Sequence, residues 1–357
     1  MGFQVIVQPG RHSFHAEPDE TILEAALRQG LSLPYGCRDG VCGACRGKVL
    51  VGQIAHGKAQ LDVLSEADRQ VGFALLCCAM ARSDLSIESR EVRSLADMPI
   101  RTLPARVHRL IRAAPEVMIV ELKLAANERL QFLAGQYVDI LLKDGKRRAF
   151  SLANAPHDDA CLELHVRHVP GGQFTDHLFS TMKERDLLRL RGPHGSFFLR
   201  EDSSKPMLLV AGGTGFAPIK AIVEHAIAQG NERPMHIYWG GRCLADLYLL
   251  RLAEQWPVQH AHIRFTSVLS ESPADQHWAG RTGLVHLAAM ADHPDLSGHQ
   301  AYVCGSPAMV AATRQDFLRH CQLPADEFFA DSFDYAADTL KAMEASQQSN
   351  TKVAPHV

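Results

Sequence analysis

The sequence predicts a multidomain protein in which an α+β part precedes an α/β part. The chain has 357 residues, which is longer than a single domain with one hydrophobic core usually is. Residues 101–200 have an almost purely strand-like pattern, whereas strand and helix patterns alternate beyond Lys205. Five of the nine cysteines lie in the first quarter of the chain, which sets that segment apart. We therefore expect domains at residues 1–92, 101–200 and 205–335, followed by a disordered polar tail at residues 336–357.

The composition excludes several classes of protein. Hydrophobic residues make up 46% of the chain and charged residues 22%, as in ordinary globular domains. Lys and Arg total 37 against 40 for Asp and Glu, and no basic stripe is present, so we expect no nucleic-acid partner. No apolar run is long enough for a membrane span, and the N-terminus lacks the pattern of a signal peptide. We expect a cytoplasmic monomer.

The first domain begins with a hairpin and a helix. Strand-like runs at Phe3–Val7 and Ser13–His15 flank a Pro-Gly turn. A helix follows, with Asp19 as the expected N-cap and Gly30 at its C-terminal end. One face of this helix is apolar and carries Ile22, Leu23, Ala26 and Leu27. The resulting strand–helix–strand unit is too small to be robust alone.

The other two domains differ in the order of their elements. The second domain has strand-like runs separated by Gly or Pro turns, which predicts a small antiparallel barrel. These runs are Ala105–Leu110, Val117–Leu124, Tyr137–Leu142, Leu162–Val169 and Leu187–Leu190. In the third domain, helical patterns follow the apolar runs Met207–Val210, Ile237–Trp239, Ile263–Val268 and Ala301–Val303. This order predicts a parallel α/β sheet with ligands at the carboxyl ends of its strands.

The N-terminal cysteines have a spacing that favours an iron–sulfur centre. Cys37, Cys42 and Cys45 form a C-x4-C-x2-C run, and Cys77 and Cys78 follow downstream. This is the plant-type [2Fe-2S] spacing, and the intervening glycines let the backbone wrap closely around sulfur. Zinc is the main alternative, but zinc sites usually pair two short C-x2-C segments. On the residues alone, Cys77 and Cys78 compete for the fourth ligand position.

Two segments of the second domain resemble the flavin-binding motifs of the ferredoxin reductase family. Arg148–Ser151 is similar to the R-x-Y-S signature, whose arginine suits a pyrophosphate and whose hydroxyl bonds near flavin N5. Phe150 replaces the commoner tyrosine, so its ring can stack on the flavin but the phenol hydrogen bond is lost. The second motif lies in His165–Leu178, where a Gly-rich turn opens a short helix that holds phosphates in the family. On their residues alone, the first segment could be ordinary surface packing and the second an ordinary strand-to-helix turn. The resemblance implies FAD, and we assign to it Arg148, Phe150, Ser151, His165, Gly171, Gly172 and Thr175.

The third domain resembles the nicotinamide-binding part of the same family. Its turn Gly212-Gly213-Thr214-Gly215 is similar to the G-G-T-G-x-x-P motif, in which glycines let pyrophosphate approach the backbone. Cys304-Gly305-Ser306-Pro307 is similar to C-G-x-P-x-M, whose thiol lies beside the nicotinamide during hydride transfer. The alternative reading is a buried, inert cysteine. The resemblance thus implies Gly305 and Pro307 as coenzyme residues, with Ser151 and Cys304 as the catalytic pair.

The residues alone do not decide which coenzyme is preferred or what role the C-terminal aromatic residues have. Asp246 could bond ribose hydroxyls and repel a 2′-phosphate, whereas Arg242 could attract one. Similar dioxygenase reductases generally use NADH, so we expect NADH, with NADPH as the alternative. Phe328, Phe329 and Phe333 form either an aromatic lid against the flavin or simply part of the core.

The resemblance covers residues 1 to about 335 and identifies the chain as a member of the ferredoxin-fused reductases. These serve aromatic-ring dioxygenases, phenol and methane monooxygenases, and deoxysugar formation. Within this family the chain looks most like the CDP-6-deoxy-Δ3,4-glucoseen reductases, on the strength of Pro34-Tyr35-Gly36-Cys37, the segment from Arg148 to Asn154, and Asp331-Ser332-Phe333. The resemblance implies a β-grasp [2Fe-2S] ferredoxin domain, an antiparallel β-barrel FAD domain and a parallel α/β nucleotide-binding domain. It also favours Cys77 as the fourth ligand, with Cys78 in the core.

The implied activity is electron transfer from NADH through FAD and the cluster to a protein acceptor, because a flavin can accept a hydride and release single electrons. The acceptor would be an oxygenase component or a pyridoxamine-phosphate-dependent dehydratase. One alternative is a stand-alone diaphorase that reduces quinones, free flavin or ferric chelates. Another is a non-catalytic redox sensor.

Overall fold

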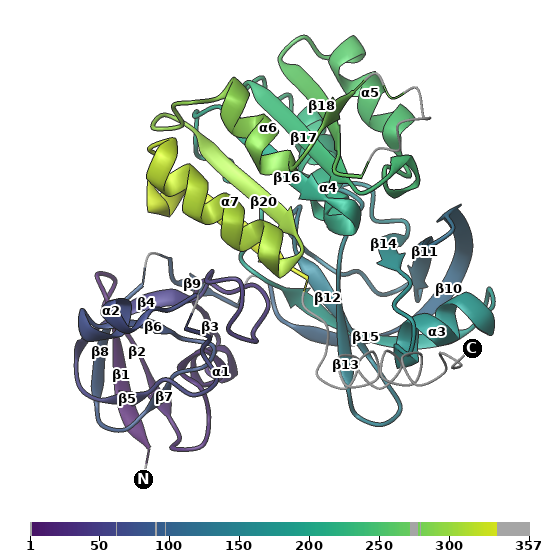
Figure 1. Ribbon diagram of the computed structural model, residues 1–357. Coiled ribbons are helices and arrows are strands. Elements are labelled where there is room, and N and C mark those ends of the chain that lie inside the picture. The colour runs from purple at the N-terminus through teal and green to yellow at the C-terminus, as the bar shows by residue number, and fades with distance from the viewer. Residues whose placement is uncertain are drawn as a thin grey trace, which may run out of the picture.

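The structure is a computed structural model that describes residues 2–61, 63–89, 91–96, 98–271, 278 and 280–333. Figure 1 shows three bodies in chain order: a small N-terminal domain, a barrel beside it, and a layered domain above both. The tail predicted at residues 336–357 lies outside the described residues. Within the described part, no helix combines the length and apolar character needed to cross a bilayer.

The N-terminal domain is a five-stranded mixed sheet with one main helix. The predicted hairpin is confirmed, since β1 (Phe3–Gln8) pairs antiparallel with β2 (His12–Ala16). The sheet order is β2-β1-β8-β4-β6, and β1 runs parallel to β8. The other strands are β4 (Arg46–Val51), β6 (Phe73–Leu75) and β8 (Leu85–Glu88). Shorter elements are β3 (Leu31–Ser32), β5 (Ile54–Ala55), α2 (Glu66–Gln70), β7 (Met80–Ala81) and β9 (Arg93–Ser94).

Helix α1 (Ile22–Arg28) begins later than expected, so the predicted N-cap at Asp19 is wrong. The cap is Thr21, whose hydroxyl accepts a hydrogen bond from the Glu24 backbone N–H at 3.2 Å. The Glu24 carboxylate accepts one from the Thr21 N–H at 3.0 Å in return. This reciprocal capping box satisfies two backbone donors, which Asp19 alone cannot do. The helix ends as expected before Gly30, which has a φ of 80°.

The second domain is the predicted antiparallel barrel. Its strand order is β13-β12-β15-β10-β11-β14. The strands are β10 (Arg101–Ala114), β11 (Val117–Leu124), β12 (Tyr137–Leu141), β13 (Arg147–Ser151), β14 (Leu162–Arg167) and β15 (Leu187–His194). A bridge between Leu152 and Leu164 joins the two edges of the sheet and closes it. Helix α3 (Gln173–Ser180) follows β14 and buries Phe174 and Leu178 in the barrel core.

The third domain is a parallel sheet covered on both faces. The strand order is β19-β18-β17-β16-β20-β21. The strands are β16 (Met207–Gly212), β17 (Met235–Gly241), β18 (Ile263–Leu269), β19 (Arg281–Thr282), β20 (Gln300–Gly305) and β21 (Phe328–Ser332). One face packs against α4 (Phe216–Ala228) and α5 (Leu250–Gln259). The other packs against α6 (Val285–Asp292) and α7 (Pro307–His320). The short 3-10 turns are η1 (Gly213–Gly215), η2 (Leu244–Asp246) and η3 (Ala325–Glu327).

Candidate functional site

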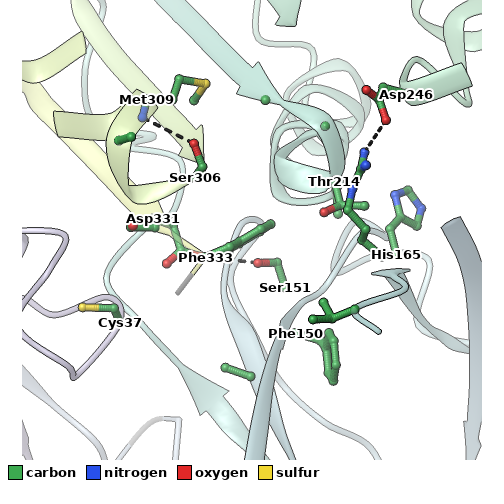
Figure 2. Close-up of a pocket in the computed structure, with 18 of the residues that line it drawn as sticks. Cys37, Phe150, Ser151, His165, Thr214, Asp246, Ser306, Met309, Asp331 and Phe333 are labelled. Carbon is green, nitrogen blue, oxygen red and sulfur yellow. Dashed lines mark hydrogen bonds and ion pairs between the residues drawn. The ribbon is translucent and has the colours of Figure 1, made fainter. Parts of the chain in front are cut away.

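A single cavity of about 1050 Å³ runs between the three domains. Cys37 and Arg38 of the N-terminal domain line one part of it. The barrel contributes the ends of β12, β13 and β14, and the third domain contributes the glycine turn after β16 and the residues after β17. Figure 2 shows Cys37, Ser151, His165, Asp246 and Phe333 around this space. A cavity of this size and shared lining can hold an extended ligand in contact with all three domains.

The four predicted cluster cysteines converge in two pairs. The Sγ atoms of Cys45 and Cys77 lie 3.1 Å apart, and the Cys42 thiol hydrogen-bonds Cys37. This bond, against the effect of burial and together with backbone N–H donors, lowers the pKa of Cys37 to about 6. Contact with Cys45 and burial raise the pKa of Cys77. Two thiol pairs suit a binuclear iron centre, which takes two thiolates at each iron and supplies positive charge to a buried site.

The loop also provides the backbone donors that such a centre needs. The N–H of Asp39 points to Cys37 Sγ at 3.4 Å, and that of Ala44 points to Cys42 Sγ at 3.5 Å. Gly40 has a φ of 82°, and a Cβ added there would lie 2.8 Å from Cys78 Sγ. The Cys78 Sγ is 3.7 Å from Cys77 Sγ and belongs to the apolar core of the domain. This fits the expected core position of Cys78.

The cluster loop is docked on the barrel through buried polar contacts. Arg38 donates two hydrogen bonds of 2.7 Å to the carboxylate of Asp139, one to each oxygen. Their side chains are 12% and 1% exposed. The Tyr137 hydroxyl donates to the Gly36 carbonyl at 2.9 Å, and the Ser196 N–H donates to the Tyr35 carbonyl at 2.8 Å. Tyr137 and Asp139 both belong to β12, so this strand holds the loop at two points, and Ser196, which follows β15, holds it at a third.

The same strand places the loop close to the flavin motif. In the β12–β13 ladder, Tyr137 lies opposite Ser151. The Ser151 hydroxyl donates to Asp331 Oδ2 at 3.3 Å. Burial and the nearby Cys37 raise the pKa of Asp331 to about 7. Figure 2 shows Asp331 between Cys37 and Ser151. The Asp331 carboxylate is therefore hydrogen-bonded to the motif serine and lies near the first cluster cysteine. Sequence reasoning did not assign this residue to the site.

The other flavin-motif residues have distinct places. Arg148, Phe150, His165, Gly172 and Thr175 line the cavity, whereas Gly171 does not line it. The ring of Phe150 lies 5.2 Å from that of Phe174, tilted by 44°. The Thr175 hydroxyl donates to the Val169 carbonyl at 2.8 Å and so holds the Gly-rich turn in shape.

His165 links the barrel to the third domain. Its Nε2 lies 2.7 Å from Glu163 Oε1, and its Nδ1 lies 2.8 Å from the Tyr248 hydroxyl. Burial lowers the pKa of His165, which keeps the ring neutral at neutral pH. Burial would raise the pKa of Glu163, but the hydrogen bond with His165 and the charge of Lys220 lower it to about 2. His165 is thus a domain contact as well as a cavity residue.

The nicotinamide motifs are divided between the cavity and the core. Gly212, Gly213 and Thr214 line the cavity, while Gly215 packs so closely that an added Cβ would overlap the Cys304 carbonyl. Cys304 is fully buried, and burial raises its pKa. Cys304, Gly305 and Pro307 are not among the lining residues, although Ser306 and Met309 are. The thiol role of Cys304 stays a prediction.

The far end of the cavity carries the predicted coenzyme residues. Asp246 pairs with Arg167 at 2.7 Å and accepts a hydrogen bond from the Arg242 N–H at 2.8 Å. Arg242 and Asp246 both line the cavity. The C-terminal aromatics are divided: Phe328 is core, Phe329 stacks on Tyr302, and Phe333 lines the cavity. The core reading therefore holds for Phe328 and Phe329, while the aromatic-lid reading stays a prediction for Phe333.

Sequence reasoning missed the residues that join the domains. These residues are Arg38, which lies inside the cysteine motif without a role in it, and Tyr137, Asp139 and Glu116, which lie in no motif. Their partners are far away in the chain. Asp331 had a signal in the Asp331-Ser332-Phe333 triplet, which served only to support the resemblance. No periodicity in the sequence could have found the other four.

Comparison with known proteins gives the same three parts. The chain matches the families described as 2Fe-2S iron-sulfur cluster binding domain over residues 5–82 and Oxidoreductase FAD-binding domain over residues 104–199. It matches Oxidoreductase NAD-binding domain over residues 209–315. These matches confirm a [2Fe-2S] cluster, FAD and NAD(H) as its cofactors.

Similar full-length proteins are reductase components. The chain is 38% identical over 333 residues to the CDP-6-deoxy-L-threo-D-glycero-4-hexulose-3-dehydrase reductase of Yersinia pseudotuberculosis, covering 93% of this chain and 99% of that protein. It is 36% identical over 338 residues to reductase component 2 of a Comamonas terephthalate 1,2-dioxygenase, covering 93% and 98%. Among solved structures, an Amycolatopsis cytochrome P450 reductase superposes with a TM-score of 0.74 at 38% identity, covering 93% and 98%. The chain therefore belongs to the ferredoxin-fused, FAD- and NAD-dependent reductases.

Proposed function

We propose that this reductase passes electrons from NADH through FAD and a [2Fe-2S] cluster to a protein acceptor. The observation that carries the proposal is the shared cavity, in which the glycine turn, the flavin motif and Cys37 line one continuous space. When bound, FAD accepts two electrons together as hydride and releases them one at a time, which a one-electron cluster requires. The acceptor is an oxygenase component or a deoxysugar dehydratase, the two partner types named for the similar proteins.

The barrel supplies the FAD site in this proposal. Arg148 would bind the pyrophosphate as a planar cation. Gly172 and Thr175 line the cavity at the start of α3, where the Thr175 hydroxyl and the Gly171 N–H, which donates to Asp176, hold the turn in shape. Phe150 packs on the isoalloxazine ring. Ser151 would present its hydroxyl to the flavin ring, and this hydroxyl donates to Asp331 Oδ2 at 3.3 Å.

The third domain supplies the nicotinamide site. Gly212, Gly213 and Thr214 cradle the pyrophosphate, because a glycine at the 53° φ of Gly213 lets the backbone approach it. Gly215 and Gly305 pack this turn against the next strand, and Pro307 opens helix α7. Cys304 lies directly behind the turn and supports its position from the core side.

The N-terminal domain supplies the exit for single electrons. Cys37, Cys42, Cys45 and Cys77 hold the cluster, with Cys45 and Cys77 as one iron pair at 3.1 Å. Arg38 and Tyr137 keep the loop against β12, so the cluster stays next to Ser151. This contact favours a relay over a stand-alone diaphorase, which needs no docked cluster.

A Cys42→Ser variant tests the proposal. It should lose the visible absorbance of the cluster and the reduction of cytochrome c, while NADH-dependent ferricyanide reduction through the flavin continues. Cys321→Ser is the matched control, because Cys321 is a buried cysteine of the third domain core. Unchanged cytochrome c reduction in Cys42→Ser would contradict the relay and favour the diaphorase.

A further inference from the structure

Four charged side chains from two domains meet at the cavity end beyond the glycine turn. Arg167 ends β14, and Glu116 lies in the β10–β11 hairpin of the barrel. Arg242 follows β17 directly, and Asp246 ends η2 of the third domain. All four line the cavity. The two arginines and two carboxylates give this end no net charge.

The inner pair of this group is already saturated. Arg167 Nη2 lies 2.7 Å from Asp246 Oδ1, and the two side chains are 22% and 9% exposed. The other carboxylate oxygen of Asp246 accepts hydrogen bonds from the backbone N–H groups of Arg242 and Cys243 at 2.8 and 3.4 Å. The Asp246 carboxylate can therefore accept few further hydrogen bonds from a ribose. Its contacts mainly link η2 to the barrel.

The outer pair, Glu116 and Arg242, is more exposed to solvent. Glu116 Oε2 lies 3.2 Å from Arg167 Nη1 and 3.3 Å from Arg242 Nη2. The side chains of Glu116 and Arg242 are 56% and 59% exposed, so a ligand can reach both. Arg242 Nε also lies 3.6 Å from Asp246 Oδ2, so two carboxylates surround this cation, and Glu116 is the exposed one.

The position of Arg242 in the sheet suggests why its contact with Glu116 matters for coenzyme binding. In parallel α/β nucleotide-binding sheets, the residues after the neighbouring strand meet the adenosine ribose, and an arginine there accommodates a 2′-phosphate. Strand β17 is the parallel neighbour of β16, which carries the glycine turn. A 2′-phosphate bound at Arg242 would therefore lie beside the Glu116 carboxylate, whereas a 2′-hydroxyl could donate a hydrogen bond to it.

We propose that Glu116 is a specificity-determining residue that makes this reductase select NADH over NADPH from the flavin domain. It neutralises Arg242 and repels the 2′-phosphate, so discrimination comes from a repulsive element supplied by the other domain. The inference rests on the proposed nicotinamide site.

A Glu116→Gln variant tests it, with ferricyanide as the acceptor so that the cluster is bypassed. The ratio of kcat/KM for NADPH to kcat/KM for NADH should rise at least tenfold, which corresponds to 1.4 kcal/mol. Glu121→Gln is the control, because Glu121 also pairs with an arginine, Arg109 at 3.1 Å, but does not line the cavity. The gain should shrink at high salt, since half-exposed charges are screened.

A second background separates the two effects of Glu116. In the Arg242→Ala background, Glu116→Gln should raise the NADPH-to-NADH ratio of kcat/KM less than threefold, because the cation that Glu116 neutralises is absent. Calorimetry gives a readout independent of turnover: 2′,5′-ADP should bind Glu116→Gln at least tenfold more tightly than the parent chain, while 5′-ADP should not gain comparably.

The outcomes distinguish this inference from the function on which it rests. If neither NADH nor NADPH bleaches the flavin, the proposed function fails. If both do so but Glu116→Gln leaves the ratio within twofold, or if Glu121→Gln changes it equally, the role of Glu116 is refuted.

Discussion

Replacing Asp139 by Asn should uncouple the cluster from the flavin without removing either. Asp139 carries both hydrogen bonds of 2.7 Å from Arg38 and also lies 3.7 Å from Arg147 and 3.4 Å from His194. Burial and the charge of Arg38 lower the pKa of His194 to about 3, so this ring is neutral at neutral pH. In the variant, Arg38 lacks a counter-charge. This matters only in the docked state, in which its guanidinium is largely buried.

The expected size of the effect follows from this burial. Breaking a buried ion pair by removing one partner costs about 3–5 kcal/mol. In the undocked state, water solvates Arg38, so the cost falls on docking. Because 1.4 kcal/mol is a factor of ten, the docking equilibrium should weaken by roughly 10²-fold to a few times 10³-fold. The contacts of Tyr35 and Tyr137 keep part of the interface. We therefore expect cytochrome c reduction to fall at least tenfold.

The assay compares two acceptors. Cytochrome c reports electrons that pass through the cluster, and ferricyanide reports those taken from the flavin. Asp139→Asn should retain at least half of the ferricyanide rate, with unchanged iron content. Asp144→Asn is the matched control, since Asp144 belongs to the same β12–β13 hairpin but pairs with Lys146 at the surface, at 3.1 Å. The reasoning is refuted if both acceptors lose rate equally, or if Asp144→Asn has the same effect.

Three further predictions concern separate parts of the molecule. Burial lowers the pKa of His236 to about 4, below its ordinary 6.5, so the unfolded chain binds a proton between these values that the folded chain does not. The free energy of unfolding should therefore fall as the pH drops from 6.5 towards 4, and His236→Asn should reduce that loss by about 1 kcal/mol in urea titrations. Gly215→Ala should destabilise the protein by about 1–3 kcal/mol because its Cβ would overlap the Cys304 carbonyl, while Gly298→Ala, which has open space, should change stability by less than about 0.5 kcal/mol. Ser151→Ala should slow flavin bleaching by NADH at least tenfold in stopped-flow traces while leaving the cluster spectrum intact; an unchanged rate would remove Ser151 from the chemistry.

The parts of the fold that local sequence could predict are those with local causes. The β1–β2 hairpin, the strands of the barrel and the strand–helix alternation of the third domain follow from hydrophobic periodicity and turn residues. The C-x4-C-x2-C run and the glycine turn are equally local, since each lies within one loop, whereas the fourth cluster cysteine, Cys77, comes from a distant segment. Even here competition matters: Asp19 is a good capping residue, but Thr21 with Glu24 makes two bonds where Asp19 makes none in the helix.

What the sequence could not predict depends on contacts between distant segments. Arg38 and Asp139 are partners across two domains, and although Arg38 lies inside the cysteine motif, nothing in the sequence pairs it with Asp139. The same holds for Glu116 with Arg242, and for Asp331 with Ser151. Cys304 shows a different limit: its motif is recognisable, but it is completely buried, and its carbonyl is packed by Gly215 of the η1 turn. Domain docking sets these relationships.

An anaerobic NADH titration followed by electron paramagnetic resonance tests the account most directly. NADH alone should bleach the flavin and produce the rhombic signal of a reduced [2Fe-2S] cluster, and the signal should be lost in Cys42→Ser. If NADH bleaches the flavin of the intact protein while the cluster stays silent until dithionite is added, electrons do not pass between the docked domains.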